Sequence, residues 1–476
     1  MTKPMYVPAD VEKLLGLLKE AGYRAYLVGG CVRDFIMNRI PHDYDITTNA
    51  LPEQVMAVME GKYQVLTTGL KHGTVTVMVE DCGFEITTFR VEGTYSDGRH
   101  PDSVEFVSDL EADLSRRDFT VNAIAYSPEE GYIDPFGGIA DIETQLIRAV
   151  GDPEKRFEED HLRILRALRF ASTLSKNPHS GQFLIDPDTA KAIEKMHPLL
   201  TTVSAERITT EMNKLLGGVN VRNILINYPY VFLTLFPELE PMYHQVQHHP
   251  WHKYNLWEHV ATVVANVEPK SYVLLWAAFL HDCGKPQVAN STPVEHIKLQ
   301  PKKSLLPLDD YQHEDVTTFV GHAQAGAKLA ETILARTALK KSHQERIVEL
   351  IQEHHSFPAH NVRSVRRWKA KHPDDSFCEQ LIRLRAADSS GFSAYGAAIA
   401  DTEIKELYDL MGKVMDSSVP YRPSQLACKG EDIIALGVKE GPQVGLILRS
   451  LLSAVVEEKV QNEKDVLLAY ARSSLL

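Results

Sequence analysis

Two aspartates separated by one residue, Asp43 and Asp45, form the clearest pair of chemically active side chains in the sequence. On a β-strand, side chains alternate between the two faces, so these carboxylates would point to the same side. Carboxylate oxygens suit Mg²⁺, which shares its coordination shell with substrate phosphates. The pair therefore predicts a Mg²⁺ site for phosphoryl or nucleotidyl transfer, with a solvated surface pair as the alternative.

A paired glycine, Gly29-Gly30, precedes these aspartates and follows the apolar run YRAYLV. Glycine tolerates positive φ and carries no side chain, so the amides of such a turn can approach a phosphate closely. A glycine pair alone is more often an ordinary turn. Here it continues into Arg33-Asp34, and GGxxRD followed by DxD is the signature of the nucleotidyltransferase superfamily. At these residues the sequence resembles the bacterial class II CCA-adding tRNA nucleotidyltransferases, which rebuild the 3′ end of tRNA.

The resemblance assigns further residues to the same site. It implies that Gly29, Gly30 and Arg33 contact the triphosphate. A second family motif, RRDxTxNA, occurs within SRRDFTVNAIAY. Its arginines can bind phosphate bidentately, and its Asp118 and Asn122 suit ribose hydroxyls.

A third acid, Glu85, lies in the β-branched run FEITTFR. A carboxylate close to the attacking 3′ hydroxyl could help to hold a second metal ion or accept the hydroxyl proton. The resemblance also implies an acid here, whereas an exposed strand glutamate is the alternative. We therefore expect Asp43, Asp45 and Glu85 to be the catalytic carboxylates.

Asp160 and Arg163 lie three residues apart in EKRFEEDHLRILRALRFAS, whose apolar positions follow a helical period. Residues so spaced share one helical face. The carboxylate accepts and the guanidinium donates, so the pair could read the edge of a base; a surface ion pair is the alternative. The pattern resembles the class II element EDxxR, which implies selection of CTP and ATP over UTP and GTP. We expect Arg166 and Arg169 to lie in the same nucleotide site.

Positive charge is concentrated between residues 148 and 169, although the chain has a net charge of −13. RNA binds where positive charge gathers on one surface, whatever the net charge. We expect Arg148 and Arg156 to contact RNA phosphates, with an ion-paired helix face as the alternative. The lysines and arginines of this segment are Arg148, Lys155, Arg156, Arg163, Arg166 and Arg169.

A second group of possible metal ligands follows residue 245 and is spread over several predicted helices. Imidazoles and carboxylates of this kind bind one or two divalent transition metals such as Mn or Ni, which lower the pKa of a water for attack on phosphorus. A single histidine would more often be a packed core residue. The ordered set resembles an HD-domain phosphohydrolase, which implies action on 2′,3′-cyclic phosphate or 2′-phosphate ends. The expected ligands are His259, His281, Asp282, His322, His354 and Asp388, with His355 an alternative to His354.

The C-terminal stretch contains Gly437, Gly441 and Gly445, which we interpret as a tight turn between two helices. Backbone amides at such a turn can bind a nucleic-acid phosphate. The stretch resembles the C-terminal part of bacterial tRNA nucleotidyltransferases, which contacts the body of the tRNA. We expect Gly441 and Gly445 to contact RNA, with a packing hairpin as the alternative.

The composition is that of a globular protein with several domains. At 476 residues, the chain is too long for one ordinary core. No early segment resembles a signal peptide, and no apolar run is long enough to span a membrane. The five scattered cysteines favour reduced thiols and therefore a cytoplasmic protein.

The order of predicted elements gives an α+β fold. We expect a helix over 10–22, strands in YRAYLVGG, YQVLTT, GTVTVMVE and FEITTFR, and a turn with short strands in IDPFGGIADIETQLIRAV. A mixed sheet with helices would form the N-terminal head, and everything after it would be α-helical. The expected parts are a nucleotidyltransferase head (1–150), a base-selecting and RNA-binding neck and body (151–235), an HD domain (236–400) and a tRNA-binding tail (401–476), with linkers at 304–310 and 416–423.

These patterns predict an enzyme that adds CCA to tRNA from CTP and ATP without a nucleic-acid template. Relatives that add only CC lack a flexible loop, and residues 90–101 have the composition of such a loop. An A-adding enzyme or a poly(A) polymerase remains an alternative. An HD nucleotide phosphohydrolase and a non-catalytic tRNA-binding protein are alternatives from other classes. The sequence leaves the oligomeric state undetermined.

Overall fold

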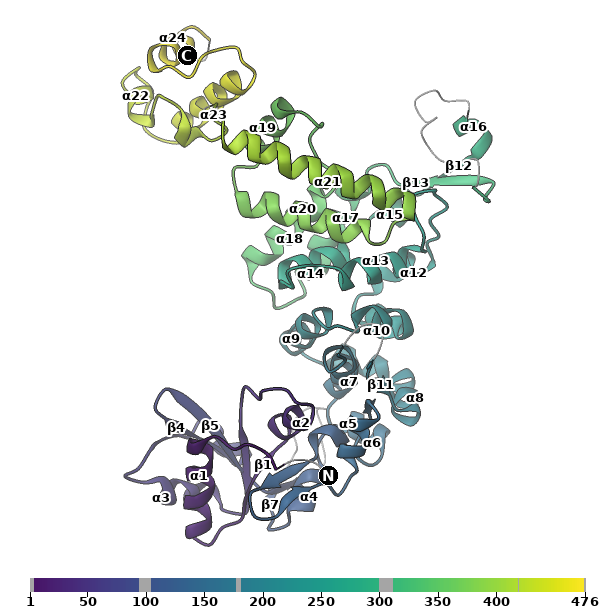
Figure 1. The fold of residues 1–476 in the computed structure, drawn as a ribbon, viewed down its shortest axis with the longest axis vertical. Helices are drawn as coiled ribbons and strands as arrows, with labels where there is room; N and C mark the ends of the chain where they lie inside the picture. Colours follow the sequence, from purple (N-terminus) through teal and green to yellow (C-terminus); the bar gives the residue numbers. More distant parts are fainter. Residues whose placement is uncertain (1–3, 94–103, 177–180, 299–310, 418, 475–476) are drawn as a thin grey trace. The chain divides into compact units, whose positions relative to one another are not determined.

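The computed structural model describes residues 4–93, 104–176, 181–298, 311–417 and 419–474. The chain forms two compact units, an N-terminal unit (Met1–Pro237) and a C-terminal unit (Glu238–Leu476) (Figure 1). The expected α+β class is confirmed, because a mixed sheet is followed by a mostly helical region.

The N-terminal unit is built on a seven-stranded mixed sheet in the order β3-β4-β5-β2-β1-β8-β9. Only the β2–β5 pair is parallel; the other neighbours are antiparallel. The alternation TVTVMV gives β4 one buried and one half-buried face, as a period of two requires. The strands are β1 (Ala25–Val28), β2 (Asp45–Thr48), β3 (Gln64–Leu66), β4 (Thr74–Val79), β5 (Cys82–Thr88), β8 (Ala125–Ser127) and β9 (Gly131–Ile133).

Short helices and turns accompany this sheet. A buried cluster that includes Tyr26, Val28, Phe89 and Ala125 joins its central strands to α4. The expected first helix is confirmed as α1, which ends two residues before Gly22. The helical and 3₁₀ elements are α1 (Ala9–Glu20), α2 (Gly30–Ile36), α3 (Pro52–Met59), η1 (Leu70–His72), α4 (Leu110–Ser115), η2 (Thr120–Asn122) and α5 (Gly138–Glu143).

The expectation for the segment after β9 is wrong in part. Between β9 and β10 (Leu146–Ile147), where we expected a turn and short strands, the chain forms helix α5. Both carboxylate oxygens of Asp134 accept backbone amides, from Gly138 at 2.7 Å and Ile139 at 2.8 Å, and so satisfy the first turn of this helix.

The expected loop at 90–101 is corrected at its start, because Arg90–Glu92 form strand β6, which pairs antiparallel with β7 (Val104–Phe106). Residues 94–101 of the loop lie outside the described residues, as do residues 304–310 of the first expected linker.

The rest of the N-terminal unit is mainly helical. The structure corrects the single helix expected here, because α6 ends at Glu159 and α7 starts at Leu162. A short parallel pair, β10 with β11 (Leu184–Ile185), also corrects the all-helical expectation. The elements are α6 (Pro153–Glu159), α7 (Leu162–Thr173), α8 (Pro187–Met196), η3 (His197–Thr202), α9 (Ala205–Leu216), α10 (Val221–Asn227) and α11 (Pro229–Leu235), followed by η4 (Pro237–Leu239) at the boundary.

The C-terminal unit contains a helical body in which α14 packs against α13, α18 and α20 (Figure 1). An antiparallel ribbon, β12 (Asn290–Pro293) with β13 (Asp315–Thr318), again departs from the all-helical expectation. The helices are α12 (Glu240–His244), α13 (Leu256–Ala265), α14 (Tyr272–Leu280), α15 (Lys285–Val288), α16 (Val294–Lys298), α17 (His322–Leu334), α18 (Lys341–Glu353), α19 (Val362–Lys371), α20 (Asp375–Ser389) and α21 (Ala394–Met415).

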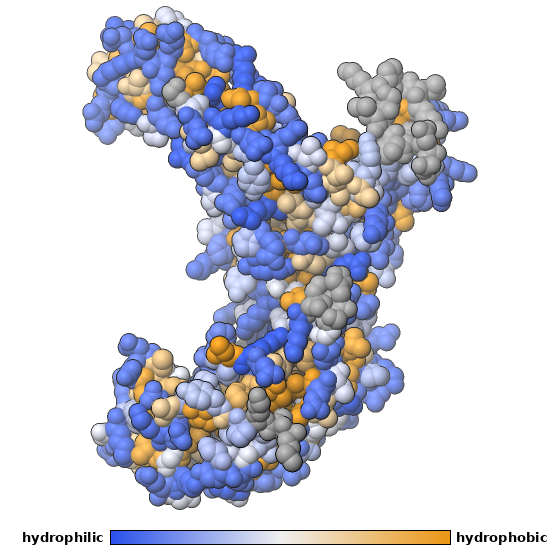
Figure 2. All heavy atoms as spheres, viewed as in Figure 1, coloured by the Kyte–Doolittle hydropathy of each residue, from blue (hydrophilic) through white to orange (hydrophobic). Residues whose placement is uncertain are grey.

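The C-terminal elements have a core of their own, which includes Val444, Ile447, Leu451 and Leu467. They are η6 (Pro423–Gln425), α22 (Gly430–Ile434), α23 (Pro442–Val456) and α24 (Lys464–Ser474). On the face shown in Figure 2, hydrophilic residues predominate on both units, and apolar residues occur in small groups. Among the described residues, no helix is both long and apolar enough to cross a membrane.

Candidate active site and metal centre

Asp45 and Glu85 are brought together by the parallel pairing of β2 and β5. Ile46 pairs with Ile86, so the residues just before them, Asp45 and Glu85, lie side by side on adjacent strands. Asp43 lies in the irregular segment before β2, so the expectation that both aspartates lie on one strand is wrong. All three acidic side chains reach solvent.

The pKa of Asp45 reflects the charges around it. Loss of hydration, followed by repulsion from Glu85, raises the pKa of Asp45 above its usual value. Attraction to Arg117 lowers this pKa, and Asp43 adds further repulsion. Like charges held together at a solvent-accessible edge are stabilised by a bound cation, so this donor set fits a divalent metal.

The glycine turn lies at the end of β1, where Val28 pairs with Asp45. Gly29 has φ +78° and precedes α2, so the turn requires a conformation that favours glycine. Its own amide donates to the carbonyl of Ile124 at 3.2 Å. A Cβ at Gly29 would lie 3.0 Å from Nη1 of Arg117, one of the arginines of the RRD motif.

We expect Gly29→Ala to destabilise the N-terminal unit by about 1–3 kcal/mol, because the backbone is strained for any side chain and Arg117 must also move. Gly61→Ala is the matched control, since Gly61 has φ +70° and nothing within 4 Å of its virtual Cβ. Calorimetric unfolding of both variants separates the two causes. Equal losses for the two variants would remove Arg117 from the explanation.

A buried polar chain lies behind the glycine turn. Arg33 donates to Oδ1 of Asn122 at 2.6 Å and pairs with Asp34 at 2.8 Å. Asn122 donates in turn to Oδ1 of Asp118 at 3.1 Å, and Oδ2 of Asp118 accepts from Arg166 at 2.6 Å. The network therefore connects Arg33 of the GGxxRD motif with Asp118 and Asn122 of the RRDxTxNA motif.

The pKa of Asp118 is well below its usual value. Burial alone would raise this pKa, but attraction to Arg166 and the hydrogen bond from Asn122 outweigh the effect of burial. The carboxylate therefore stabilises the folded state fully above its unfolded pKa, and this contribution is lost as the pH falls toward the lowered folded value.

We expect Asp118→Asn to lower the unfolding free energy of the N-terminal unit by roughly 2 kcal/mol at pH 7, because the variant weakens a largely buried ion pair with Arg166. Arg166 keeps Glu211 as a second, more distant partner at 3.6 Å, which limits the loss. Denaturant unfolding should show the wild type losing its advantage below about pH 4, where Asp118 is protonated in the unfolded state. An advantage that grows on acidification would contradict this assignment.

Asp160 and Arg163 are not on one helical face, because the chain breaks between α6 and α7. Asp160 is extended (φ −145°) and its carboxylate accepts the amide of Leu162 at 3.1 Å, in the first turn of α7. Its other oxygen pairs with Arg207 at 2.7 Å. Arg163 is buried and pairs with Glu159 at 2.7 Å. The expected helical geometry of the pair is therefore wrong.

Both residues nevertheless lie beside the polar network. Arg163 contributes to the lowered pKa of Asp118, and Asp160 contributes to the raised pKa of Arg166. Arg163 also donates to the carbonyl of Arg116 at 2.9 Å. The α6–α7 break is thus adjacent to the RRD motif.

Several arginines expected at the nucleotide or the RNA are engaged within the protein. Arg156 is buried and pairs with Glu159, and Arg169 pairs with Glu211 at 2.8 Å. Arg148 is about half exposed and bridges two other carboxylates, Asp141 and Asp186. This ion-paired arrangement was the alternative to an RNA-binding face.

A second site lies inside the C-terminal unit, where four helices and their ends contribute histidines. In each of four histidines, Nδ1 faces a backbone carbonyl at 2.6–3.3 Å. A carbonyl can only accept, so Nδ1 carries the proton and Nε2 keeps a lone pair for a metal. These residues are His259 on α13, His281 after α14, His322 at the start of α17 and His354 after α18.

Asp282 lies at the centre of this group. Its Oδ2 is 3.3 Å from Nε2 of His259 and 3.2 Å from Nε2 of His281, while its Oδ1 is 3.4 Å from Nε2 of His322. Asp388 on α20 completes the group, with its Oδ1 3.1 Å from Nε2 of His259. The expected ligands therefore converge.

The buried donor atoms of this centre fit a metal. In the described structure, His259 Nε2, His281 Nε2 and Asp282 Oδ1 are buried without a hydrogen-bond partner, whereas Asp282 Oδ2 is ion-paired with Lys285 at 2.7 Å. Such atoms are costly to bury unless they coordinate an ion. The pKa of Asp282 lies well below its usual value, because attraction to His281 and Lys285 outweighs burial.

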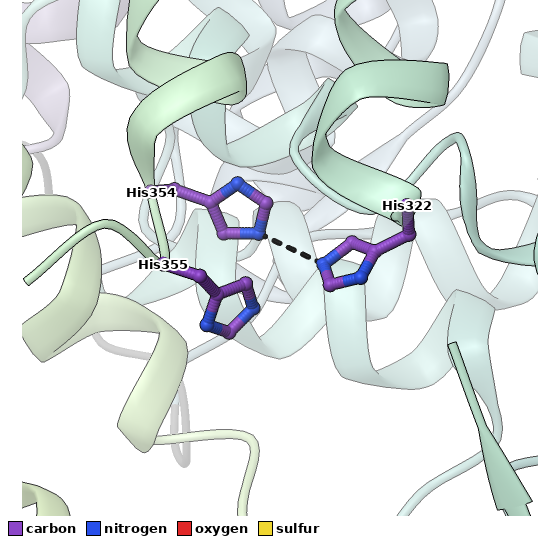
Figure 3. Close-up of side chains that lie close together, drawn as sticks. All are labelled: His322, His354 and His355. Carbon is purple, nitrogen blue, oxygen red and sulfur yellow. Dashed lines mark hydrogen bonds between the residues drawn. The ribbon is translucent and has the colours of Figure 1, made fainter. Parts of the chain in front are cut away.

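His354 and His355 have different places at this centre (Figure 3). Nε2 of the buried His354 lies 3.2 Å from Nε2 of His322 and 3.8 Å from Asp282. His355 is exposed and lines a pocket of about 330 Å³ at the mouth of the site. The geometry favours His354 as the inner ligand and places His355 at the rim.

Four family models match successive parts of the chain. They are the Poly A polymerase head domain (25–148), the "Probable RNA and SrmB- binding site of polymerase A" (182–242), the HD domain (248–389) and tRNA nucleotidyltransferase domain 2 (384–471). The chain is 46% identical to the CCA-adding enzyme of Enterococcus faecalis and 51% identical to that of Geobacillus stearothermophilus. These alignments cover 45% and 42% of this chain and 51% and 47% of the relatives. The chain thus spans about half the length of the curated relatives it matches.

The similarity to a solved structure extends over the whole chain. The Bacillus stearothermophilus CCA-adding enzyme in complex with CTP is 29% identical, with a TM-score of 0.67 and coverage of 97% of this chain and 95% of that one. The chain is therefore similar to CCA-adding enzymes in sequence over a little under half of its length and in fold over nearly all of it. The Thermotoga maritima CCA-adding enzyme complexed with tRNA shares the fold at 17% identity, with a TM-score of 0.56 and coverage of 99% of this chain and 97% of that one.

Sequence reasoning did not predict the contacts of several polar residues around the two sites. Lys285 Nζ lies 2.7 Å from Asp282, and Arg385 Nη1 lies 3.2 Å from Asp388. Arg207 binds Asp160. The position of Arg385, three residues before Asp388 on a helix, was a signal that could have been used.

Of the three glycines expected in the C-terminal turn, one lies elsewhere. Gly441 immediately precedes α23, but Gly445 lies inside this helix rather than in the turn. The neighbouring Val444 and Ile447 pack into the local core. The expected turn therefore extends only over residues 435–441, where Gly437 and Gly441 have positive φ.

Proposed function

We propose that this protein adds C, C and A to the 3′ end of tRNA from CTP and ATP, without a nucleic-acid template. The observation that carries the proposal is the convergence of Asp45 and Glu85 on adjacent strands, with Asp43 close enough to raise the pKa of Asp45. This is the donor set that a nucleotidyl transfer reaction requires. Similarity to the CTP-bound Bacillus stearothermophilus enzyme over nearly all of both chains supports it.

In this proposal Asp43 and Asp45 hold Mg²⁺, which would neutralise charge on the triphosphate, and Glu85 assists. Gly29, Gly30 and Arg33 contact the phosphates. Their position beside β2 supports these roles, because Val28 at the start of the turn pairs with Asp45.

The polar network supports positioning roles for the remaining residues. Asp118 and Asn122 already bind Arg166 and Arg33, so contact with the ribose requires these bonds to rearrange. Base selection by Asp160 and Arg163 similarly requires each to exchange its present partner for the base edge. Arg169 would stay paired with Glu211 and support the site without contacting the nucleotide.

The test is to supply tRNAs lacking CCA, CA or A with each nucleotide in turn and to determine the added sequence. Addition of CCA from CTP and ATP alone is the expected result. Addition of a single A, only to tRNA that ends in CC, would favour an A-adding enzyme, and long A tracts would favour a poly(A) polymerase. The tRNA contacts proposed for Arg148, Arg156, Gly441 and Gly445 can be tested in the same assay by substitution.

The buried histidine and aspartate cluster supports a second activity, hydrolysis of 2′,3′-cyclic phosphate or 2′-phosphate ends. His259, His281, Asp282, His322, His354 and Asp388 would hold a divalent transition metal such as Mn or Ni, which would make a water acidic enough to attack phosphorus. For a cyclic ester, one P–O bond forms to water, one P–O bond to ribose breaks, and the released ribose oxygen takes the proton. Lys285 and Arg385 line the pocket and can bind phosphate oxygens.

We also propose that the protein acts in the cytoplasm, in agreement with five free cysteines. The two activities would then serve the same RNA end, because breaking the 3′ P–O bond of a cyclic phosphate frees the 3′ hydroxyl to which nucleotides are added.

A further inference from the structure

A second cavity adjoins the mouth of the metal centre in the C-terminal unit. It has a volume of about 140 Å³ and is formed by the loop after α18, by α20 and by α21. The cavity shares His355 and Arg385 with the pocket that contains Asp388 and His322. The residues that line it are His355, Phe357, Pro358, His360, Arg385, Glu403, Ile404 and Leu407.

Arg385 connects the two cavities. Its guanidinium lies 3.2 Å from Oδ2 of the metal-centre residue Asp388 and 3.6 Å from Oε2 of Glu403 in the second cavity. The side chain is only 12% exposed, so these two contacts fix its place. A phosphate held at the metal centre would therefore be separated from the second cavity by a single side chain.

The lining of the second cavity combines apolar surfaces with polar groups. Phe357, Pro358, Ile404 and Leu407 supply apolar contacts, while His360 and Glu403 supply the polar ones. A nucleobase has matching properties, because its faces are apolar and its edge carries donors and acceptors. The Glu403 side chain is 42% exposed and can only accept when ionised.

We propose that this cavity binds the base of the nucleoside whose 2′,3′-cyclic phosphate or 2′-phosphate reaches the metal centre. Glu403 accepts a hydrogen bond from the exocyclic amino group of adenine or cytosine, and Ile404 and Phe357 contact the face of the base. Uracil offers no amino group and leaves the carboxylate facing a carbonyl oxygen. This inference rests on the hydrolase part of the proposed function.

The first test fills the cavity with Ile404→Trp and uses Tyr408→Trp as its control. Tyr408 is on the same helix but is exposed and does not line the cavity. We expect Ile404→Trp to raise the KM for adenosine 2′,3′-cyclic phosphate by about tenfold or more, the effect of losing about 1.4 kcal/mol of binding. The KM for glycerol 1,2-cyclic phosphate, which has no base, should not change in either variant.

The second test uses Glu403→Gln, which changes the shape of the side chain less than Ile404→Trp does and therefore disturbs folding less. An amide can accept or donate, so the preference for adenosine over uridine 2′,3′-cyclic phosphate should fall by about fivefold or more. Calorimetric titration with adenosine 2′-monophosphate provides a readout besides turnover, and binding should weaken in Ile404→Trp but not in Tyr408→Trp. CTP binding at the N-terminal unit should be the same in all variants.

The outcomes separate this inference from the function on which it rests. Equal KM values for the adenosine and base-free esters in the wild type, or an unchanged adenosine KM in Ile404→Trp, would overturn the base-binding cavity while leaving the hydrolase intact. Unchanged base preference in Glu403→Gln would remove Glu403 from recognition. If no ester is hydrolysed, the hydrolase proposal fails, and equal calorimetric binding to Ile404→Trp and wild type would still overturn the cavity.

Discussion

Asp45→Ala is expected to abolish nucleotide addition, lowering the rate of CTP incorporation into tRNA lacking CCA by about three orders of magnitude or more. A metal ion contributes several kcal/mol to a phosphoryl-type transition state, and each 1.36 kcal/mol corresponds to a factor of about ten. Asp45 lies next to Glu85 at the proposed metal site, so the variant removes a ligand of the ion. Single-turnover incorporation of labelled CTP measures the effect.

The loss should not arise from unfolding. The pKa of Asp45 is raised, so its ionised form is less favourable in the folded than in the unfolded protein. This penalty is present at pH 7 and disappears as the pH falls below the folded pKa. A neutral residue removes the penalty, and Asp45→Asn should therefore unfold at the same temperature as the wild type or higher.

Asp81→Ala is the matched control for charge. Asp81 is an exposed acid in the turn between β4 and β5 of the same sheet. This variant should retain wild-type incorporation, and Asp45→Ala should retain hydrolysis at the second site. Incorporation by Asp45→Ala at the wild-type rate would show that the metal assignment is wrong.

Asp282→Asn is expected to empty the second metal site and to eliminate hydrolysis of 2′,3′-cyclic phosphates. Asp282 is the carboxylate that faces His259, His281 and His322. Removing even an outer partner of a ligand costs about 10–100-fold in metal affinity or activity, so loss of this central ligand should cost more than about 100-fold. Elemental analysis of the purified variant measures the metal directly.

Nucleotide addition supplies the internal control, because Asp282→Asn should leave the rate of CTP incorporation unchanged. The variant also leaves the buried Lys285 without its ion-pair partner, so its unfolding must be measured alongside. Asp409→Asn, at an exposed position on α21, controls for the substitution itself. A folded Asp282→Asn protein with full metal content would contradict the assignment.

At the carboxylate site, local sequence patterns predict some elements, whereas pairing between distant strands decides which side chains meet. Strand and glycine signals predicted β1 and the turn closely, but only Asp45 of the aspartate pair lies on a strand. The approach of Glu85 to Asp45, however, depends on the parallel register of β2 and β5, whose residues are separated by about forty positions. No local pattern specifies such a register, because it is set by which faces are buried together.

At the break between α6 and α7, the periodicity of apolar residues predicted one continuous helix and was wrong. The apolar positions on both sides of Asp160 fit one helix, but the carboxylate instead accepts the amide of Leu162 and pairs with Arg207 from α9. Aspartate competes with helix continuation by such local bonds. The partner on α9 becomes visible only in the folded chain.

By itself, the sequence determined the resemblance to CCA-adding enzymes, the α+β class and the kinds of ligand available, because motifs and periodicity are local properties. Only the tertiary structure decided which groups meet: Asp45 with Glu85, Asp118 with Arg166, and Arg385 between two cavities. It also placed His354 rather than His355 next to Asp282. The physical reason is that burial, strand register and ion pairing depend on contacts between residues distant in sequence, and these exist only once the core has formed.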